Sequence, residues 1–113
     1  MTFELIRSKL SELFNRKISL IEMNNLYPHH VGHYIGLDVH DTPSISRSLS
    51  LTPGVTITIE PGIYIPDDEI YPEEFRNIGI RIEDDIQITH GDPVILSAEA
   101  PKEVIDIETL MSN

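Results

Sequence analysis

Residues 29–41 read HHVGHYIGLDVHD and contain four of the five histidines of the chain. A folded domain rarely needs so many imidazoles in one short segment for packing alone. Neutral imidazole is the commonest side-chain metal ligand, and it also exchanges protons near neutral pH. The glycines at positions 32 and 36 carry no Cβ, so backbone or ligand can come close to them. The segment therefore predicts one metal site, around which the rest of the chain is organised.

The secondary structure of this segment is ambiguous from its pattern. Two histidines have the i, i+4 spacing of the zincin motif, but that motif requires Glu after its first His, and position 30 is His. The glycines and β-branched residues also disfavour a helix. In a strand, the odd-numbered residues of 31–39 share one face, and His40 falls on the other unless a bulge or kink near Gly36 re-aims it. We predict a short, irregular strand that ends near Asp41.

Composition limits the class of protein. With 113 residues the chain is one domain or part of one. Its formal net charge of −11 argues against nucleic acid and anionic membrane as partners, because both attract basic surfaces. The absence of cysteine excludes disulfides and thiolate metal sites. No apolar run has the length of a membrane span, and the first residues carry no recognisable targeting signal.

Periodic patterns predict two helices and several strands. Apolar residues spaced by three and four predict a helix over 2–17 and a closing helix over 102–111, after Pro101. Residues 18–28 are predicted to be a connection. Thr42-Pro43 and the serine-rich residues 44–50 are predicted to form a surface loop. Strands are predicted at 55–60, 63–65, 78–88 and 93–96.

Alternation assigns a face to each strand residue. In residues 55–60 the isoleucines point to a core and Glu60 points the other way; in residues 78–88 the isoleucines likewise share one face, and Glu83 lies on the other. We expect both isoleucine faces to be buried under the two helices. If the two strands pair antiparallel, Glu60 and Glu83 can share a face.

These polar residues suit a metal ion. Imidazole with two carboxylates and no thiolate fits Mn²⁺, Zn²⁺ or Co²⁺, and a bridging carboxylate could hold two ions. Pro61-Gly62 ends the strand at Glu60 and holds its carboxylate at a rim. Four other residues are expected to be structural or solvated, or to bond loop backbone or orient a histidine: His30, His90, Asp38 and Asp41.

Three motifs, in order and in spacing, resemble the Xaa-Pro aminopeptidases, the aminopeptidase P branch of the M24 metallopeptidases. They are PHHVGHYIGLDVHDTP at 28–43, IEPGIYI at 59–65 and GIRIED at 79–84, and their wording is most similar to the mitochondrial type. The resemblance implies an α+β fold, the C-terminal half of a pita-bread (creatinase/aminopeptidase) fold with an antiparallel sheet and flanking helices. Residues 1–113 would then be a partial M24 peptidase catalytic domain.

The resemblance also implies roles. His33, Glu60 and Glu83 match three of the family's five metal ligands, with Glu83 bridging two ions and Glu60 assigned the general-base role. His40 matches the catalytic histidine that contacts the substrate carbonyl and stabilises the tetrahedral intermediate. The matches to the pocket for the substrate proline are His29, Tyr64 and Arg81. The implied cofactors are two divalent ions, Mn²⁺ before Zn²⁺ or Co²⁺, and the implied substrates are peptides with proline at the second position.

One departure from the family is large. Its other two ligands are aspartates of a preceding half, whereas residues 1–27 contain no aspartate. We therefore expect a fragment or truncated product, inactive alone, whose partner is the missing N-terminal half. A homodimer of the full-length protein and a mitochondrial or cytoplasmic location are further expectations. Two alternatives stay open, namely a non-catalytic binding module with the M24 fold and a fragment without an independent role.

Overall fold

The computed structural model describes residues 1–41 and 44–112, so the predicted turn at Thr42-Pro43 lies outside the described residues. The chain divides into two units. Unit 1 consists of Met1–Val31 and Glu60–Arg81, and unit 2 consists of Gly32–Ile59 and Ile82–Asn113. Each unit combines helix with antiparallel strands, which confirms the α+β class.

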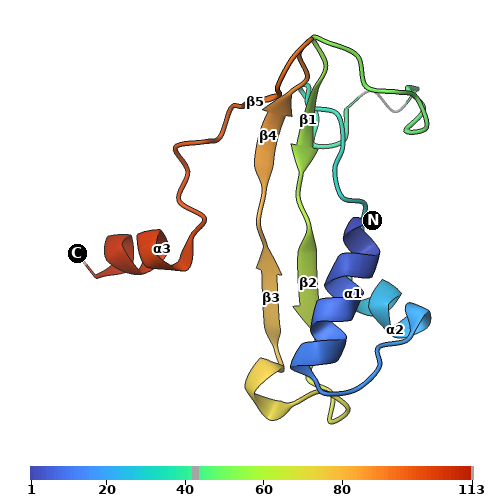
Figure 1. Ribbon diagram of the computed structural model, residues 1–113, viewed down its shortest axis with the longest axis vertical. Helices are drawn as coiled ribbons and strands as arrows, with labels where there is room; N and C mark the ends of the chain where they lie inside the picture. Colours follow the sequence, from blue (N-terminus) through green and yellow to red (C-terminus); the bar gives the residue numbers. More distant parts are fainter. Residues whose placement is uncertain (42–43, 113) are drawn as a thin grey trace. The chain divides into compact units, whose positions relative to one another are not determined.

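Unit 1 packs two helices against a β-hairpin. Helices α1 (Thr2–Leu13) and α2 (Leu20–Leu26) lie beside strand β2 (Gly62–Ile65), which pairs with β3 (Ile78–Arg81) from Gly62↔Arg81 to Ile65↔Ile78 (Figure 1). The short 3-10 helix η1 (Glu73–Phe75) lies between the two strands in sequence. A single apolar cluster joins these elements; its members are Leu10, Phe14, Ile18, Met23, Leu26, Tyr27, Ile65 and Tyr71.

The prediction that residues 18–28 form only a connection is wrong, because they contain α2. The Ser19 side chain accepts a hydrogen bond from the backbone N–H of Glu22 at 3.1 Å, which satisfies one of the unpaired donors of the first turn. Met23 and Leu26 are then fully buried. Serine followed three residues later by glutamate is a capping-box pattern, so the sequence does carry this signal. Helix α1 is present as predicted but ends at Leu13.

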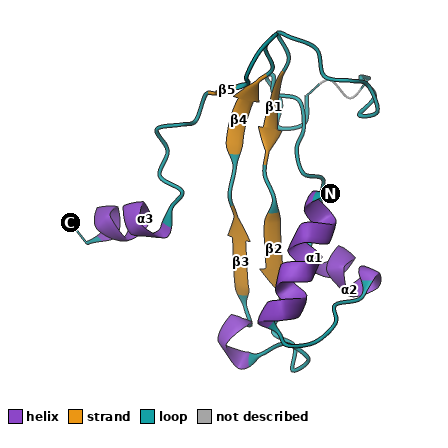
Figure 2. Ribbon diagram, in the orientation of Figure 1, coloured by secondary structure: helices purple, strands orange, loops and turns teal. Residues whose placement is uncertain are grey.

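Unit 2 is built on a three-stranded antiparallel sheet. Its order is β1 (Thr56–Ile59), β4 (Asp84–Gln87) and β5 (Val94–Ile95), with β1 and β4 paired from Thr56↔Gln87 to Ile59↔Asp84. The antiparallel pairing expected from the alternating patterns is thus confirmed. The strand predicted over 78–88 is divided into β3 and β4. Loop dominates residues 32–41 and 44–55 (Figure 2).

The short strand predicted to end near Asp41 is only partly present, because residues 29–41 form no named strand and their pairing with β1 stops before Asp41. Tyr34 forms an isolated antiparallel bridge with Ile57. In unit 2, the N–H of Ile35 donates to the Thr56 carbonyl at 3.1 Å and the N–H of Thr58 donates to the His33 carbonyl at 2.9 Å. This pairing ends at Gly36, where bends and turns begin.

The expectation that helices bury both isoleucine faces is wrong. Ile80 is 58% exposed and Ile82 49% exposed, whereas Thr58 and Glu60 are only 3% and 6% exposed. Helix α3 (Val104–Met111) contains no buried residue. Polar side chains of β1 and its continuation are buried because neighbouring residues hydrogen-bond to them, as described below. Among the described residues, every helix is too short or too polar to span a lipid bilayer.

A polar network joins β4 to the segment before α3. Lys102 Nζ lies 2.7 Å from Asp84 Oδ1, and the Ser97 hydroxyl donates to the same oxygen at 2.6 Å. The hydrogen bonds from Lys102 and then from Ser97 lower the pKa of Asp84. The last part of the chain is thereby tied to the sheet of unit 2.

The buried face of α2 can be tested with two leucines of the same helix. Leu26→Ala should lower the free energy of unfolding by about 2–5 kcal/mol, because it leaves a cavity at a fully buried position. Leu20, which is 57% exposed, is the matched control, and Leu20→Ala should cost less than about 1 kcal/mol. Urea unfolding followed by circular dichroism measures both. Equal losses would show that α2 does not bury its Leu26 face.

Candidate functional site

In unit 1, four predicted site residues form one hydrogen-bonded chain, here called the Glu60 cluster: Glu60, Arg81, Tyr64 and His29. Arg81 Nη1 donates to Glu60 Oε2 at 2.9 Å, and Arg81 Nε donates to the Tyr64 hydroxyl at 2.6 Å. The Tyr64 hydroxyl lies 3.2 Å from His29 Nε2. The buried Glu60 carboxylate is thus charge-paired, which offsets the cost of removing it from water.

The proton positions in the Glu60 cluster follow from its acceptors. His29 Nδ1 lies 2.7 Å from the carbonyl oxygen of His30, and a carbonyl can only accept, so Nδ1 carries the proton. In neutral His29 the lone pair is then on Nε2, which accepts from the Tyr64 hydroxyl. The Tyr64 oxygen in turn accepts from Arg81. The cluster is therefore polarised from the guanidinium towards the imidazole.

Tyr27 packs against this cluster and was not predicted to belong to it. Its ring meets that of His29 edge-on, with centroids 4.9 Å apart. Its hydroxyl is buried without a hydrogen-bond partner among the described residues. Burial first, and then the negative charge of Glu60, raise the pKa of Tyr27.

In unit 2, His33 is fixed by its backbone and by its ring. Its N–H donates to Thr58 Oγ1 at 3.0 Å, and its carbonyl accepts from the Thr58 N–H. A Cβ at Gly32 would collide with the Thr58 carbonyl, so only glycine permits this approach. His33 Nδ1 lies 2.9 Å from the Tyr34 carbonyl oxygen, which places the proton on Nδ1. In neutral His33 the lone pair available for coordination is on Nε2.

A kink after Gly36 brings His40 to His33. The two imidazole centroids are 4.9 Å apart at 85°, although the two residues would lie on opposite faces of a regular strand. Asp41 Oδ2 accepts from the N–H groups of Leu37 at 2.6 Å and Asp38 at 3.5 Å, which closes the turn. The alternative of a kink near Gly36 and the backbone-bonding role of Asp41 are thus confirmed.

Glu83 directly precedes β4 and is exposed. One of its carboxylate oxygens lies within 4.8 Å of a ring nitrogen of His33 in the same unit. Its carboxylate has no hydrogen-bond or ion-pair partner within residues 1–41 and 44–112. It is therefore a negative charge beside an imidazole, placed so that a cation could engage both.

The predicted site residues fall into two groups, one in each unit. Unit 1 brings Glu60, Arg81, Tyr64 and His29 together, and unit 2 brings His33, His40 and Glu83 together. The convergence of Glu60 with the two ligands of unit 2 stays a prediction. His30 and His90 are both exposed, as expected.

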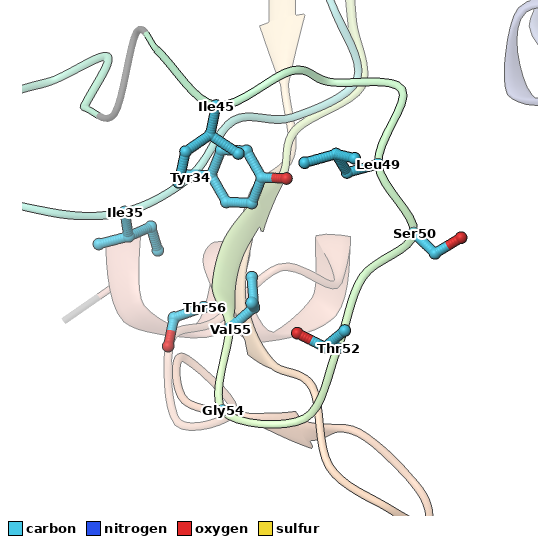
Figure 3. A pocket seen from close by; sticks show the side chains of 9 residues that line it. All are labelled: Tyr34, Ile35, Ile45, Leu49, Ser50, Thr52, Gly54, Val55 and Thr56. Carbon is cyan, nitrogen blue, oxygen red and sulfur yellow. The ribbon is translucent and has the colours of Figure 1, made fainter.

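A separate pocket of about 600 Å³ lies in unit 2 and contains none of the predicted site residues. Its lining is uncharged and mostly apolar, with Tyr34 and Ile45 on one side and Leu49 on the other (Figure 3). Tyr34 follows His33, and successive side chains of an extended segment point to opposite faces. The Tyr34 side chain, which lines the pocket, and the His33 side chain therefore point to opposite faces of this segment.

Sequence comparison assigns the class of protein. The chain belongs to metallopeptidase family M24, whose profile matches residues 3–90. It is 54% identical over 120 residues to human Xaa-Pro aminopeptidase 3, covering 99% of this chain and 23% of that protein. It is 50% identical over 109 residues to intermediate cleaving peptidase 55 of Saccharomyces cerevisiae, covering 96% of this chain and 21% of that protein. The chain thus spans less than a quarter of the length of these relatives.

Structure comparison gives the same family. The crystal structure of Icp55 from Saccharomyces cerevisiae matches with a TM-score of 0.89 and 49% identity, covering 98% of this chain and 28% of that one. Aminopeptidase P from Escherichia coli with the inhibitor Pro-Leu matches with a TM-score of 0.82 and 40% identity over the same shares. The resemblance to the Xaa-Pro aminopeptidases and the partial pita-bread fold are therefore confirmed.

The kink at Gly36 can be tested without any ligand. A Cβ at Gly36 would overlap the Asp41 carboxylate, so Gly36→Ala should open the turn and separate the two imidazoles. The nuclear Overhauser effect between the His33 and His40 rings should be lost. Gly91→Ala is the matched control, because a Cβ there meets open space, and it should keep the signal. A retained signal in Gly36→Ala would show that Asp41 does not hold the kink.

Proposed function

We propose that this chain supplies three metal ligands and the proline-side pocket of an Xaa-Pro aminopeptidase. The ligands are His33, Glu60 and Glu83, and the proposal places residues 1–113 in the C-terminal half of the catalytic domain. The observation that carries it is the state of His33, whose Nδ1 is tied to a carbonyl while a carboxylate oxygen of Glu83 lies within 4.8 Å of its ring. Family membership and the 54% identity to an Xaa-Pro aminopeptidase support it.

The donor set fits a divalent ion. One imidazole and two carboxylates are ligands that Mn²⁺ accepts, with Zn²⁺ or Co²⁺ as alternatives. When bound, two such ions would polarise the scissile carbonyl and lower the pKa of the attacking water. Glu83 would hold both ions, and Glu60 would act as ligand and general base, while the hydrogen bond from Arg81 orients the Glu60 carboxylate. His40 would contact the carbonyl oxygen of the scissile bond and stabilise the tetrahedral intermediate.

The remaining residues of the Glu60 cluster suit a proline ring. The His29 and Tyr64 rings lie 5.6 Å apart and the Arg81 guanidinium lies over the Tyr64 ring, so the three side chains form one ordered wall. Their mutual hydrogen bonds hold this wall in place before any ligand binds, which reduces the entropy cost of binding. The substrates would be peptides with proline at the second position. The Pro-Leu inhibitor of the Escherichia coli relative is compatible with such a pocket.

Three ligands are fewer than the five of the family, and the chain should be inactive alone. Its activity would then require the missing N-terminal half as a partner, in a full-length protein that could be a homodimer. A mitochondrial location is favoured, because a plant relative is named a mitochondrial intermediate cleaving peptidase. A non-catalytic binding module with this fold is the competing outcome of the experiments below.

Metal binding by the 113-residue chain tests the ligands. Mn²⁺ should bind weakly, as measured by the loss of the free-ion signal in electron paramagnetic resonance. His33→Ala and Glu83→Gln should each weaken this binding at least tenfold, because each removes a donor. His90→Ala is the control, since His90 is an exposed histidine of the same unit. Mn²⁺ binding that is equal in all four proteins would exclude the proposed site.

Peptide cleavage tests whether the chain is an incomplete catalytic domain. The chain alone should not cleave an Arg-Pro-Pro peptide in the presence of Mn²⁺, and it should gain cleavage only when the missing half is supplied in trans. Efficient turnover by the chain alone, abolished by Glu83→Gln, would contradict its expected inactivity. Absence of turnover even with the other half bound would favour the binding module.

A further inference from the structure

The side chains of Asp84, Ser97 and Lys102 form one hydrogen-bonded network, and Asp84 directly follows Glu83 in sequence. Asp84 Oδ1 accepts from Lys102 Nζ at 2.7 Å and from the Ser97 hydroxyl at 2.6 Å. Lys102 also donates to the Ser97 carbonyl at 3.2 Å, and the Ser97 hydroxyl accepts from the Asp85 N–H at 3.0 Å. Every contact belongs to unit 2, and the Lys102 and Asp84 side chains are partly buried.

This network fixes the backbone of residues 84 and 85 from two sides. On one side Asp84 pairs with Ile59 of β1. On the other side the Leu96 N–H donates to the Asp85 carbonyl at 2.8 Å, next to the Ser97 contact. Glu83 is one peptide bond away, and its own carboxylate has no partner within residues 1–41 and 44–112. Its place beside His33 is therefore set by the backbone that the network holds.

Three neighbouring carboxylates favour a positive charge close to them at this place. Residues 83–85 read Glu-Asp-Asp, so three carboxylates follow one another at the start of β4. Two of them repel the third unless a cation is close. The Lys102 ammonium neutralises the middle carboxylate and holds it in the network, where it cannot compete with Glu83 for a bound ion.

We propose that Lys102 is a positioning residue for Glu83: through Asp84 and Ser97 it holds the strand start so that the Glu83 carboxylate stays beside His33. The proposal rests on the proposed function, because it concerns the affinity of the same metal site. Removing a residue that orients a metal ligand typically lowers metal affinity 10–100-fold. Lys102 acts one residue away from Glu83, so we expect a loss near the lower end, about tenfold.

The sign of the effect separates positioning from simple electrostatics. Lys102→Met removes a positive charge, and by charge alone it should strengthen binding of a cation. A weaker affinity can then come only from the lost geometry. Ser97→Ala removes the hydroxyl contacts to Asp84 and to the Asp85 N–H without a charge change, and it should act in the same direction because it opens the same network. Lys102→Arg restores a cation of similar reach. Lys9→Met makes the same charge change as Lys102→Met at an exposed ion pair of α1.

The experiment titrates Mn²⁺ into the wild-type chain and these four variants, with free Mn²⁺ measured by electron paramagnetic resonance. We expect about tenfold weaker binding in Lys102→Met and Ser97→Ala, and wild-type affinity in Lys102→Arg and Lys9→Met. Amide hydrogen exchange at Asp85 should become faster only in the two weakened variants, because Ser97 is its acceptor.

Two results would overturn the proposal in distinguishable ways. Wild-type Mn²⁺ affinity in Lys102→Met and Ser97→Ala, with binding still lost in Glu83→Gln, refutes the positioning role and leaves the metal site standing. No Mn²⁺ binding by the wild-type chain refutes the metal site, and the role of Lys102 with it.

Discussion

Unit 2 depends on the close approach of residues 32–35 to strand β1. Two backbone hydrogen bonds and the Thr58 hydroxyl hold this approach, and a side chain at Gly32 would collide with the Thr58 carbonyl. Because His33 is bonded at both its N–H and its carbonyl, the imidazole starts from a fixed backbone. A metal ligand needs such fixing, since a displacement of a few tenths of an ångström changes a coordination bond. Gly32 is therefore required for the close approach that fixes His33, although it carries no side chain.

Among the described residues, two polar side chains are buried in addition to the eight apolar residues of the core. Thr58 accepts a hydrogen bond from the His33 N–H, and Glu60 accepts one from Arg81. The isoleucines of β3 have no comparable cover among the described residues. A buried polar group is tolerated when each of its atoms has a partner, and such satisfied groups also define a unique arrangement. The hydrogen bonds of Thr58 and Glu60 thus order the backbone of His33 and the side chain of Arg81.

The sequence predicted the local elements well and the non-local contacts poorly. Alternation located β1, β2, β3 and β4, and the family motifs identified His33, Glu60 and Glu83 as candidate ligands. The capping-box pattern that begins at Ser19 indicates α2, but residues 18–28 were predicted to be a connection. The turn at Gly36 depends on the Asp41 carboxylate, and the packing of α3 depends on surfaces that periodicity cannot specify. The strand positions and their antiparallel pairing were therefore predictable, whereas the buried faces and the residues that cover them were not.

The His29 and His33 rings each form the same local hydrogen bond, but their second ring nitrogens have different surroundings. Each ring donates from Nδ1 to the carbonyl of the next residue, which fixes its tautomer without help from distant elements. In His29 the Nε2 lone pair accepts from Tyr64, so the ring becomes part of a rigid wall. In His33 the same lone pair belongs to a ring that lies beside the unpaired Glu83 carboxylate. Within residues 1–41 and 44–112, the His33 ring is fixed at Nδ1 and has a carboxylate oxygen of Glu83 within 4.8 Å of a ring nitrogen. The two rings thus share one local hydrogen bond and differ in the side chain that lies near them, which is Tyr64 for His29 and Glu83 for His33.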